Sequence, residues 1–252
     1  MNIVFEYKNR RFTDFLNILE EYSPSEFDSP YRSTVPFLQY WRDTGRRLTE
    51  FVNLMALNVP PKATLSFEHR VAPPKGKGNS SQTDLMILTD QYAVGVEAKY
   101  TEPRYQTVEK WLGTSSNKRS VLEGWLDLVR SVHEKMSIRV EDILDLPYQL
   151  IHRCASVCSH TGNIRIIVYQ CFDVDEKKSE YYRGHLNSLK KRLGSPTNLW
   201  FMLVNHPLLK SDKYSELQLL WDNGKRRMHE KVLNILRNAA ICEFRKPDVT
   251  IL

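Results

Sequence analysis

The chain has 252 residues, of which 41% are hydrophobic and 11% aromatic, so it is long enough to bury a full core. Its apolar runs, such as Ile166–Tyr169 and Leu199–Val204, are far shorter than the roughly 18 residues that a membrane helix needs, and neither a membrane span nor membrane association is expected. The 36 Lys and Arg residues exceed the 30 Asp and Glu residues, and this net charge of +6 favours polyanionic partners only modestly.

In chain order, the first residues, MNIVFEYKNRR, contain no apolar stretch before a small-residue cleavage site. A secretory signal is therefore not expected, and the cytoplasm is the expected location. A helix is expected around Phe12–Glu21, followed by a break rich in Pro and Ser. A helical region from about Thr34 to Asn58 comes next and is closed by Pro60 and Pro61.

Three strands are expected after this helical region, at Thr64–Val71, Thr83–Leu88 and Tyr92–Tyr100. A loop rich in Gly, Pro and Lys, Pro73–Ser81, joins the first two. The alternation of the first strand places Leu65, Phe67, His69 and Val71 on one face and Ser66, Glu68 and Arg70 on the other. The third strand has Val94, Val96 and Ala98 on one face and Gly95, Glu97 and Lys99 on the other.

The remaining elements alternate between helices and strands. Expected helices are Pro103–Leu112, Ser120–Met136, which starts with a capping-box spacing of Ser120 and Glu123, and Pro147–Ser159. Expected strands are Ile164–Cys171, Leu199–Asn205 and Leu217–Trp221, followed by a basic helix from about Lys225 to Cys242. The four cysteines are too few for a disulfide scaffold, so reduced thiols are expected.

This order predicts an α/β (α+β) fold in which helices flank a mixed central sheet. An antiparallel three-strand meander comes first, and a long helical crossover then adds Ile164–Cys171 in parallel. We expect one domain over residues 1–252, with a core at about 44–171, a helical N-terminal extension at 1–43, and C-terminal strands and a basic helix at 172–252.

Two carboxylates and a lysine on the second and third predicted strands form the main candidate site. Asp84 is followed thirteen positions later by Glu97, and Lys99 shares the strand face of Glu97 because side chains alternate. Carboxylate oxygens are ligands that Mg²⁺ prefers, a metal-bound water is a good nucleophile, and a lysine stabilises charge on a phosphate under attack. The alternative is that Glu97 and Lys99 form an ordinary solvated strand face.

Two segments, Gln82-Thr83-Asp84-Leu85-Met86-Ile87 and Val94-Gly95-Val96-Glu97-Ala98-Lys99-Tyr100, resemble the PD-(D/E)XK nuclease superfamily, which has the restriction-endonuclease-like fold. The resemblance covers roughly Thr44 to Cys171. It implies that Asp84 and Glu97 bind Mg²⁺ or Mn²⁺ and that Lys99 is the catalytic lysine. Thr83 stands where the motif has proline, a substitution that the superfamily often shows.

The same resemblance implies accessory residues. Members often supply an acid from the helix before the meander, for which Glu50 is the candidate, although Glu50 could equally pair with Arg46 or Arg47 at helical spacing. Glu68 competes for this role as a catalytic and metal-binding acid, against the alternative of an exposed carboxylate beside Arg70. Gln149 resembles the glutamine of the exonuclease branch; it would orient a water or a phosphate, with Arg153 holding a phosphate, unless both lie on a solvated helix shoulder.

Basic residues elsewhere fit contacts to DNA. The loop Pro73–Ser81 carries Lys75 and Lys77, and its glycines let backbone amides approach a phosphate. We therefore expect a Mg²⁺-dependent deoxyribonuclease whose partner is DNA, with homodimerisation left open. Two alternatives remain: a catalytically weak protein of the same fold that binds nucleic acid or a partner protein, and a protein unrelated to nucleic acid.

Overall fold

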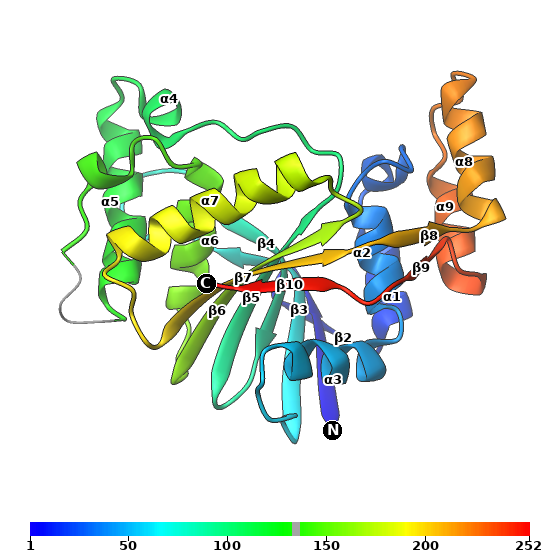
Figure 1. Cartoon of the computed structure of the whole chain (residues 1–252), viewed down its shortest axis with the longest axis horizontal. Coiled ribbons are helices and arrows are strands. Elements are labelled where there is room, and N and C mark those ends of the chain that lie inside the picture. The colour runs from blue at the N-terminus through cyan, green and yellow to red at the C-terminus, as the bar shows by residue number, and fades with distance from the viewer. Residues whose placement is uncertain (133–136) are drawn as a thin grey trace.

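The computed structural model describes residues 1–132 and 137–252, and these ranges form an eight-stranded mixed sheet with helices on both faces (Figure 1). The strands follow the spatial order β10-β7-β6-β5-β4-β3-β1-β2, and β8 and β9 form a separate pair. The predicted mixed α/β architecture is confirmed. The strands are β1 Asn2–Tyr7, β2 Arg10–Phe12, β3 Lys62–Val71, β4 Ser81–Leu88, β5 Tyr92–Lys99, β6 Ile164–Phe172, β7 Leu199–His206, β8 Leu208–Lys210, β9 Cys242–Phe244 and β10 Asp248–Ile251.

Helices cover the two faces of this sheet in two groups (Figure 1). The first core layer lies under α1 Phe15–Glu21, α2 Thr34–Trp41, α3 Thr44–Leu54, α8 Asp212–Asp222, α9 His229–Asn238 and the short 3-10 helix η1 Pro24–Phe27. The second lies under α4 Val108–Leu112, α5 Ser116–Arg130, α6 Tyr148–Cys158, α7 Glu176–Arg192 and η2 Val140–Ile143. No helix in the described ranges has both the length and the hydropathy of a membrane-crossing helix. All four cysteines are free and buried.

The predicted meander and crossover are confirmed by the strand pairing. β3, β4 and β5 pair antiparallel in succession, and β6 joins β5 in parallel after the chain has passed through α4, α5 and α6. β7 extends the parallel part, and β10 closes this edge by pairing antiparallel with β7.

The beginning of the chain differs from the predicted helical extension. β1 adds in parallel to β3, pairing Asn2 with Lys62 and Tyr7 with Phe67, and β2 pairs with β1. The N-terminal strands are therefore part of the central sheet. The predicted helical region Thr34–Asn58 is two helices, because the chain breaks between α2 and α3.

The second half also requires corrections. The predicted strand Leu217–Trp221 lies inside α8, whose N-terminus is capped by the Ser211 side chain. A short apolar run fits a strand or a buried helix face equally well, so periodicity could not decide between them. Helix α7 was not predicted, and the predicted helix Lys225–Cys242 is only α9, followed by β9 and β10. α5 begins at Ser116 with Ser115 as its cap, not at Ser120, and the predicted end at Met136 lies outside the described residues.

Helix α6 packs unusually close to β5 at Gly95. A Cβ atom placed on Gly95 would lie 2.3 Å from Cγ2 of Val157, nearer than two carbon atoms can approach. Gly95 shares its strand face with Glu97 and Lys99, so the glycine sets how closely α6 approaches the polar face of β5.

We expect Gly95→Ala to destabilise the protein by about 1–3 kcal/mol, because the added methyl group overpacks the contact with Val157. Urea unfolding measures this change, and Gly95→Ala combined with Val157→Ala should recover part of the loss. The matched control is Gly184→Ala in α7, where the added Cβ meets nothing within 4 Å apart from its chain neighbours and the backbone of its own helix. This control should be neutral or stabilising by up to about 1 kcal/mol. Equal stability of Gly95→Ala and wild type would contradict the packing described.

Candidate functional site

The candidate site begins where β4 and β5 separate. The last paired residues of these two strands, at this end of the sheet, are Leu85 and Val96. Beyond this pair, the backbone N–H of Ala98 donates to Oδ2 of Asp84 at 2.6 Å, so a side-chain carboxylate replaces the backbone acceptor of the missing pair. Asp84 is therefore held directly against the strand that carries Glu97 and Lys99.

Glu97 and Lys99 are both buried and in direct contact. Nζ of Lys99 donates to Oε1 of Glu97 at 2.9 Å, and their exposed fractions are 0% and 4% respectively. The expected strand alternation holds here, since Val96 and Ala98 pack into the opposite core layer. The structure thus brings together the three residues on which the sequence interpretation depends. The alternative of a solvated strand face does not hold.

Helix α6 completes the cluster with two more side chains. Nε of Arg153 donates to Oε2 of Glu97 at 2.5 Å, and Oε1 of Gln149 accepts from Nζ of Lys99 at 2.9 Å. The four-residue step from Gln149 to Arg153 along the helix is about 6 Å, and the two-residue step along the strand is about 6.6 Å. The two helix residues can therefore contact Lys99 and Glu97 respectively. We call Asp84, Glu97, Lys99, Gln149 and Arg153 the carboxylate–lysine cluster.

Arg153 differs from the expectation of a phosphate-binding residue on the helix surface. It is only 8% exposed, and its guanidinium is engaged by Glu97 and by Oγ of Ser81 at 3.1 Å. Tyr105 was not predicted at all: its hydroxyl accepts from Nζ of Lys99 at 3.0 Å. The predicted helix Pro103–Leu112 includes Tyr105, but α4 begins only at Val108, so Tyr105 lies in an irregular segment where helical periodicity does not indicate which side chains turn inward.

Glu68 lies at a break in the alternation of β3. Its φ of 50° is left-handed, which is uncommon for a residue other than glycine. The alternation predicted for this strand fails here, because Nδ1 of His69 bonds to Oγ of Ser66, three residues away, on one face. The β3–β4 register pairs Phe67 with Leu85 and His69 with Thr83, so Glu68 and Asp84 are the two residues between these pairs. The Glu68 carboxylate accepts from Nε2 of Gln82. Strained backbone of this kind clusters at functional sites.

Glu50 does not join the cluster, which corrects its assignment as a catalytic acid. Helix α3 packs on the opposite face of the sheet, and within the described residues Glu50 pairs only with Arg47 at 2.6 Å and Arg46 at 3.9 Å. Between the two candidates for the additional acid, Glu68 is the one near Asp84.

The loop between β3 and β4 is held on helix α5 by both of its lysines. Nζ of Lys75 pairs with Asp127 at 2.6 Å, so Lys75 is less available for phosphate than expected. The side chain of Asn117 holds the backbone of Lys77 by two hydrogen bonds: it accepts from Lys77 N at 2.8 Å and donates to Lys77 O at 2.7 Å. The Lys77 side chain itself stays exposed.

The three acids around the cluster differ in charge state. Burial, followed by the nearby Glu97 and Glu68 carboxylates, raises the pKa of Asp84 well above its usual range. Burial also opposes ionisation of Glu97, but Arg153 and Lys99 outweigh it and lower the pKa of this carboxyl. Burial is likewise the main reason that the pKa of Glu68 rises to about 7. Glu97 is thus a stable anion, whereas Asp84 and Glu68 hold their protons more tightly than ordinary carboxyl groups do.

This excess of acid bears on whether the site fits a divalent cation. In the described part of the chain, no group of three or more His, Cys, Asp or Glu side chains is arranged to hold a metal ion. Mg²⁺ keeps several of its waters, however, so two carboxylates such as Asp84 and Glu97 are a sufficient protein contribution. A cation would also offset the charge that raises the pKa of Asp84. The donor set therefore fits Mg²⁺ or Mn²⁺ in charge and chemistry.

A family model described as Domain of unknown function (DUF6946) matches residues 11–206. The chain belongs to this family. The matched span contains the entire carboxylate–lysine cluster and ends with β7, before α8, α9 and β10. No curated protein and no solved structure was found to match the chain.

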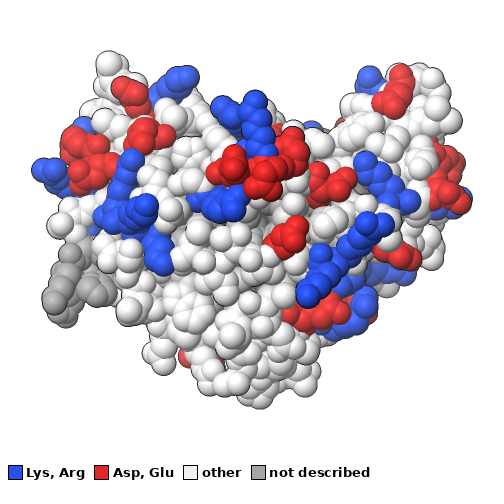
Figure 2. Space-filling model, in the orientation of Figure 1, with Lys and Arg blue, Asp and Glu red and all other residues white. Residues whose placement is uncertain are grey.

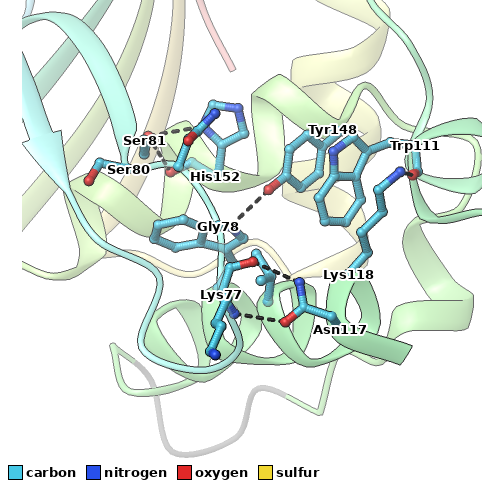
Figure 3. Close-up of a pocket in the computed structure, with 12 residues that line it drawn as sticks. Lys77, Gly78, Ser80, Ser81, Trp111, Asn117, Lys118, Tyr148 and His152 are labelled. Atoms are coloured by element: carbon cyan, nitrogen blue, oxygen red, sulfur yellow. Dashed lines mark hydrogen bonds between the residues drawn. The ribbon is translucent and has the colours of Figure 1, made fainter. Parts of the chain in front are cut away.

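An aromatic pocket of 330 Å³ lies beside the cluster, between α5, α6 and the loop that precedes β4 (Figure 3). The rings of Trp111 and Tyr148 stack at 3.6 Å, and Nε1 of Trp125 donates to the Tyr148 hydroxyl at 3.1 Å. Trp111, Tyr148 and His152 also line a second hollow of 330 Å³, whose other lining residues include Gln149 and Arg153. The aromatic pocket and the cluster therefore adjoin.

We expect the stability of the wild type to fall as the pH rises from about 4.5 to about 7, relative to Glu68→Gln. The folded pKa of Glu68, about 7, lies above its ordinary value of 4.5, so the folded state binds this proton more tightly than the unfolded chain. The difference should be absent below pH 4.5 and reach about 1–3 kcal/mol above pH 7, in favour of Gln. Urea unfolding across this range measures it.

The matched control for this pH experiment is Glu180→Gln, because Glu180 is exposed on α7. Its stability should follow the wild type at every pH. A Glu68→Gln profile parallel to that of the wild type would show that Glu68 is not a high-pKa acid.

Proposed function

We propose that the chain is a cytoplasmic, metal-dependent nuclease that hydrolyses phosphodiester bonds of DNA. The observation that carries the proposal is the convergence of Asp84, Glu97 and Lys99 from two neighbouring strands, with Arg153 and Gln149 added from α6. Two acids, a lysine and an arginine in one place are the groups that phosphoryl chemistry requires.

In this proposal, Asp84 and Glu97 hold the cation, with Glu68 as an additional acid nearby. Bound Mg²⁺ or Mn²⁺ lowers the pKa of its water and neutralises phosphate charge. Glu97 suits this task because its lowered pKa keeps it ionised. Asp84, whose pKa is raised, would become a stable anion only when positive charge arrives.

Lys99 already uses every proton it can donate. Its ammonium has three donors, and these go to Glu97, Tyr105 and Gln149. Tyr105 and Gln149 are neutral acceptors that line the hollow, so a phosphate oxygen entering there would replace one of them at Lys99. The exchange is favourable because a charged acceptor forms a stronger hydrogen bond with an ammonium than a neutral one does.

The aromatic pocket supports a nucleic acid as substrate. Bases have flat faces that pack on aromatic rings, and a phosphate held at Gln149 and Arg153 would leave its base beside Trp111 and Tyr148. The exposed Lys77 and the partly buried Lys118 lie at the same pocket and would offset backbone charge (Figure 3).

A second candidate function is binding without cleavage. Both carboxylate oxygens of Glu97 accept hydrogen bonds from positively charged side chains, those of Lys99 and Arg153. All three ammonium protons of Lys99 are donated within the chain. A network that saturates itself in this way also serves as a structural core for a protein that only binds nucleic acid or a partner.

We expect Asp84→Asn and Lys99→Met to reduce cleavage of supercoiled and linear DNA in Mg²⁺ or Mn²⁺ by roughly 100-fold or more, because each removes charge from the reacting centre. Asn at position 84 can still accept from Ala98 N, so the fold should persist, which thermal melting checks.

The controls are Glu180→Gln and Lys177→Met, both exposed on α7. Equal cutting by wild type and cluster variants would disprove the site; salt-sensitive DNA binding without cutting by wild type would favour the second candidate.

We expect Trp111→Ala to weaken binding of single-stranded DNA about tenfold in EDTA, because stacking on an aromatic ring contributes roughly 1–3 kcal/mol per base. Fluorescence anisotropy with a labelled oligonucleotide measures the change. The matched control is Trp221→Ala: Arg226 lies 4.0 Å from the Trp221 ring, much as Lys118 lies 5.4 Å from Trp111. Equal losses in both variants would show that the aromatic pocket does not hold the base.

A further inference from the structure

A buried relay of side chains crosses the face of the sheet opposite the carboxylate–lysine cluster. Nε1 of Trp41 donates to Oε1 of Gln170 at 3.1 Å, and Nε2 of Gln170 lies 3.2 Å from Nε2 of His206. An indole N–H can only donate, so it fixes the orientation of the Gln170 amide, whose NH₂ group must then donate to His206. All three side chains are at most 2% exposed.

The relay determines where His206 carries its proton. Burial, followed by the charge of Arg47, lowers the pKa of His206 to about 3, so the ring is neutral. Because Nε2 accepts from Gln170, the proton lies on Nδ1. Nδ1 is therefore an N–H donor, and among the described residues it has no hydrogen-bond partner.

Arg47 supplies a second donor of the same kind. Its Nε is buried and also lacks a partner in the described part of the chain. Its guanidinium is held in place by Glu50 at 2.6 Å and by the rings of Tyr40 at 4.6 Å and Phe244 at 5.2 Å. Buried donors are rarely left unpaired, since removing them from water without a partner costs free energy. Two such donors in one place are suited to an acceptor supplied from outside the chain.

Both side chains line one pocket of 480 Å³ between α3, the end of β7 and the chain that leads into β10. Its lining also includes Arg245, Lys246 and Arg46, which pairs with Asp43 at 2.7 Å, and Glu50 is the only acid among the described residues that line it. Figure 2 shows Lys and Arg side chains, with acidic ones between them, over this part of the molecule. The pocket thus combines unpaired donors with an excess of positive charge.

We propose that this pocket binds a phosphate group. Nδ1–H of His206 and Nε–H of Arg47 donate to its oxygen atoms, and Arg46, Arg245 and Lys246 offset its charge. Several cations together match a multiply charged tetrahedral anion, and an arginine held in a fixed orientation binds phosphate with little further loss of freedom. The proposal is independent of nuclease activity, because the pocket and the cluster lie on opposite faces of the sheet.

The experiment titrates the purified chain with inorganic phosphate, against sodium chloride at equal ionic strength. We expect the melting temperature to rise by a few degrees and the His206 imidazole resonances to shift in ¹H–¹⁵N spectra. His69 is the internal control, because both nitrogens of this buried ring already have partners, Ser66 and His160. No effect beyond that of chloride, or equal shifts of both rings, would overturn the proposal.

Variants separate the site from general charge effects. Arg47→Met should abolish phosphate binding, whereas Arg183→Met, which removes a surface arginine paired with Glu176 on α7, should not change it. Because Arg47→Met could unfold the protein, the second variant combines Arg245→Met and Lys246→Met, both exposed residues, and should weaken binding roughly tenfold. Unchanged affinity in this double variant would refute the proposed pocket.

The source of the phosphate is distinguished by a duplex oligonucleotide added in EDTA. If the duplex also shifts the His206 resonances, the pocket takes a backbone phosphate of nucleic acid. If inorganic phosphate alone shifts them, the ligand is a small free anion. Either result supports the site, and neither depends on whether the chain cleaves DNA.

Discussion

The close packing of α6 on the polar face of β5 is the constraint on which the candidate site depends. It requires Gly95, because any larger residue would meet Val157, and it draws Glu97, Lys99 and Arg153 into the interior. Buried ion pairs add little net stability, since the loss of hydration offsets their attraction. Removing one partner is costly, however, because a buried charge is then left uncompensated. We therefore interpret the network as a device that fixes side-chain positions.

The same packing gives similar acids different chemical character. Lys99 and Arg153 lie against the Glu97 carboxylate, which stays ionised, whereas Asp84 and Glu68 are partly buried near other acids and hold their protons more tightly. Environments that move the pKa values of neighbouring acids apart are typical of catalytic sites. Glu68 and Asp84 lie between two registered strand pairs, and the backbone of Glu68 is left-handed there. This indicates that the position is set by the role of the Glu68 side chain and not by strand geometry.

Local patterns predicted the elements with strong periodicity and failed where the pattern was short. The meander, α6 and β6 follow from alternation and helical period, but Leu217–Trp221 is helical although its apolar run also fits a strand. Glu50 shows a different limit. Its helix was expected, yet periodicity indicates which side of a helix is buried and not which face of a sheet the helix covers.

The amino-acid sequence by itself determined that Glu97 and Lys99 share a strand face and that Asp84 lies on the preceding strand, because alternation and a short turn are local properties. Only the tertiary structure decided that Arg153 neutralises Glu97, that Tyr105 reaches Lys99, and that His206 ends a relay from Trp41. These contacts join residues from separate elements. They depend on how helices and strands pack, which no local pattern encodes.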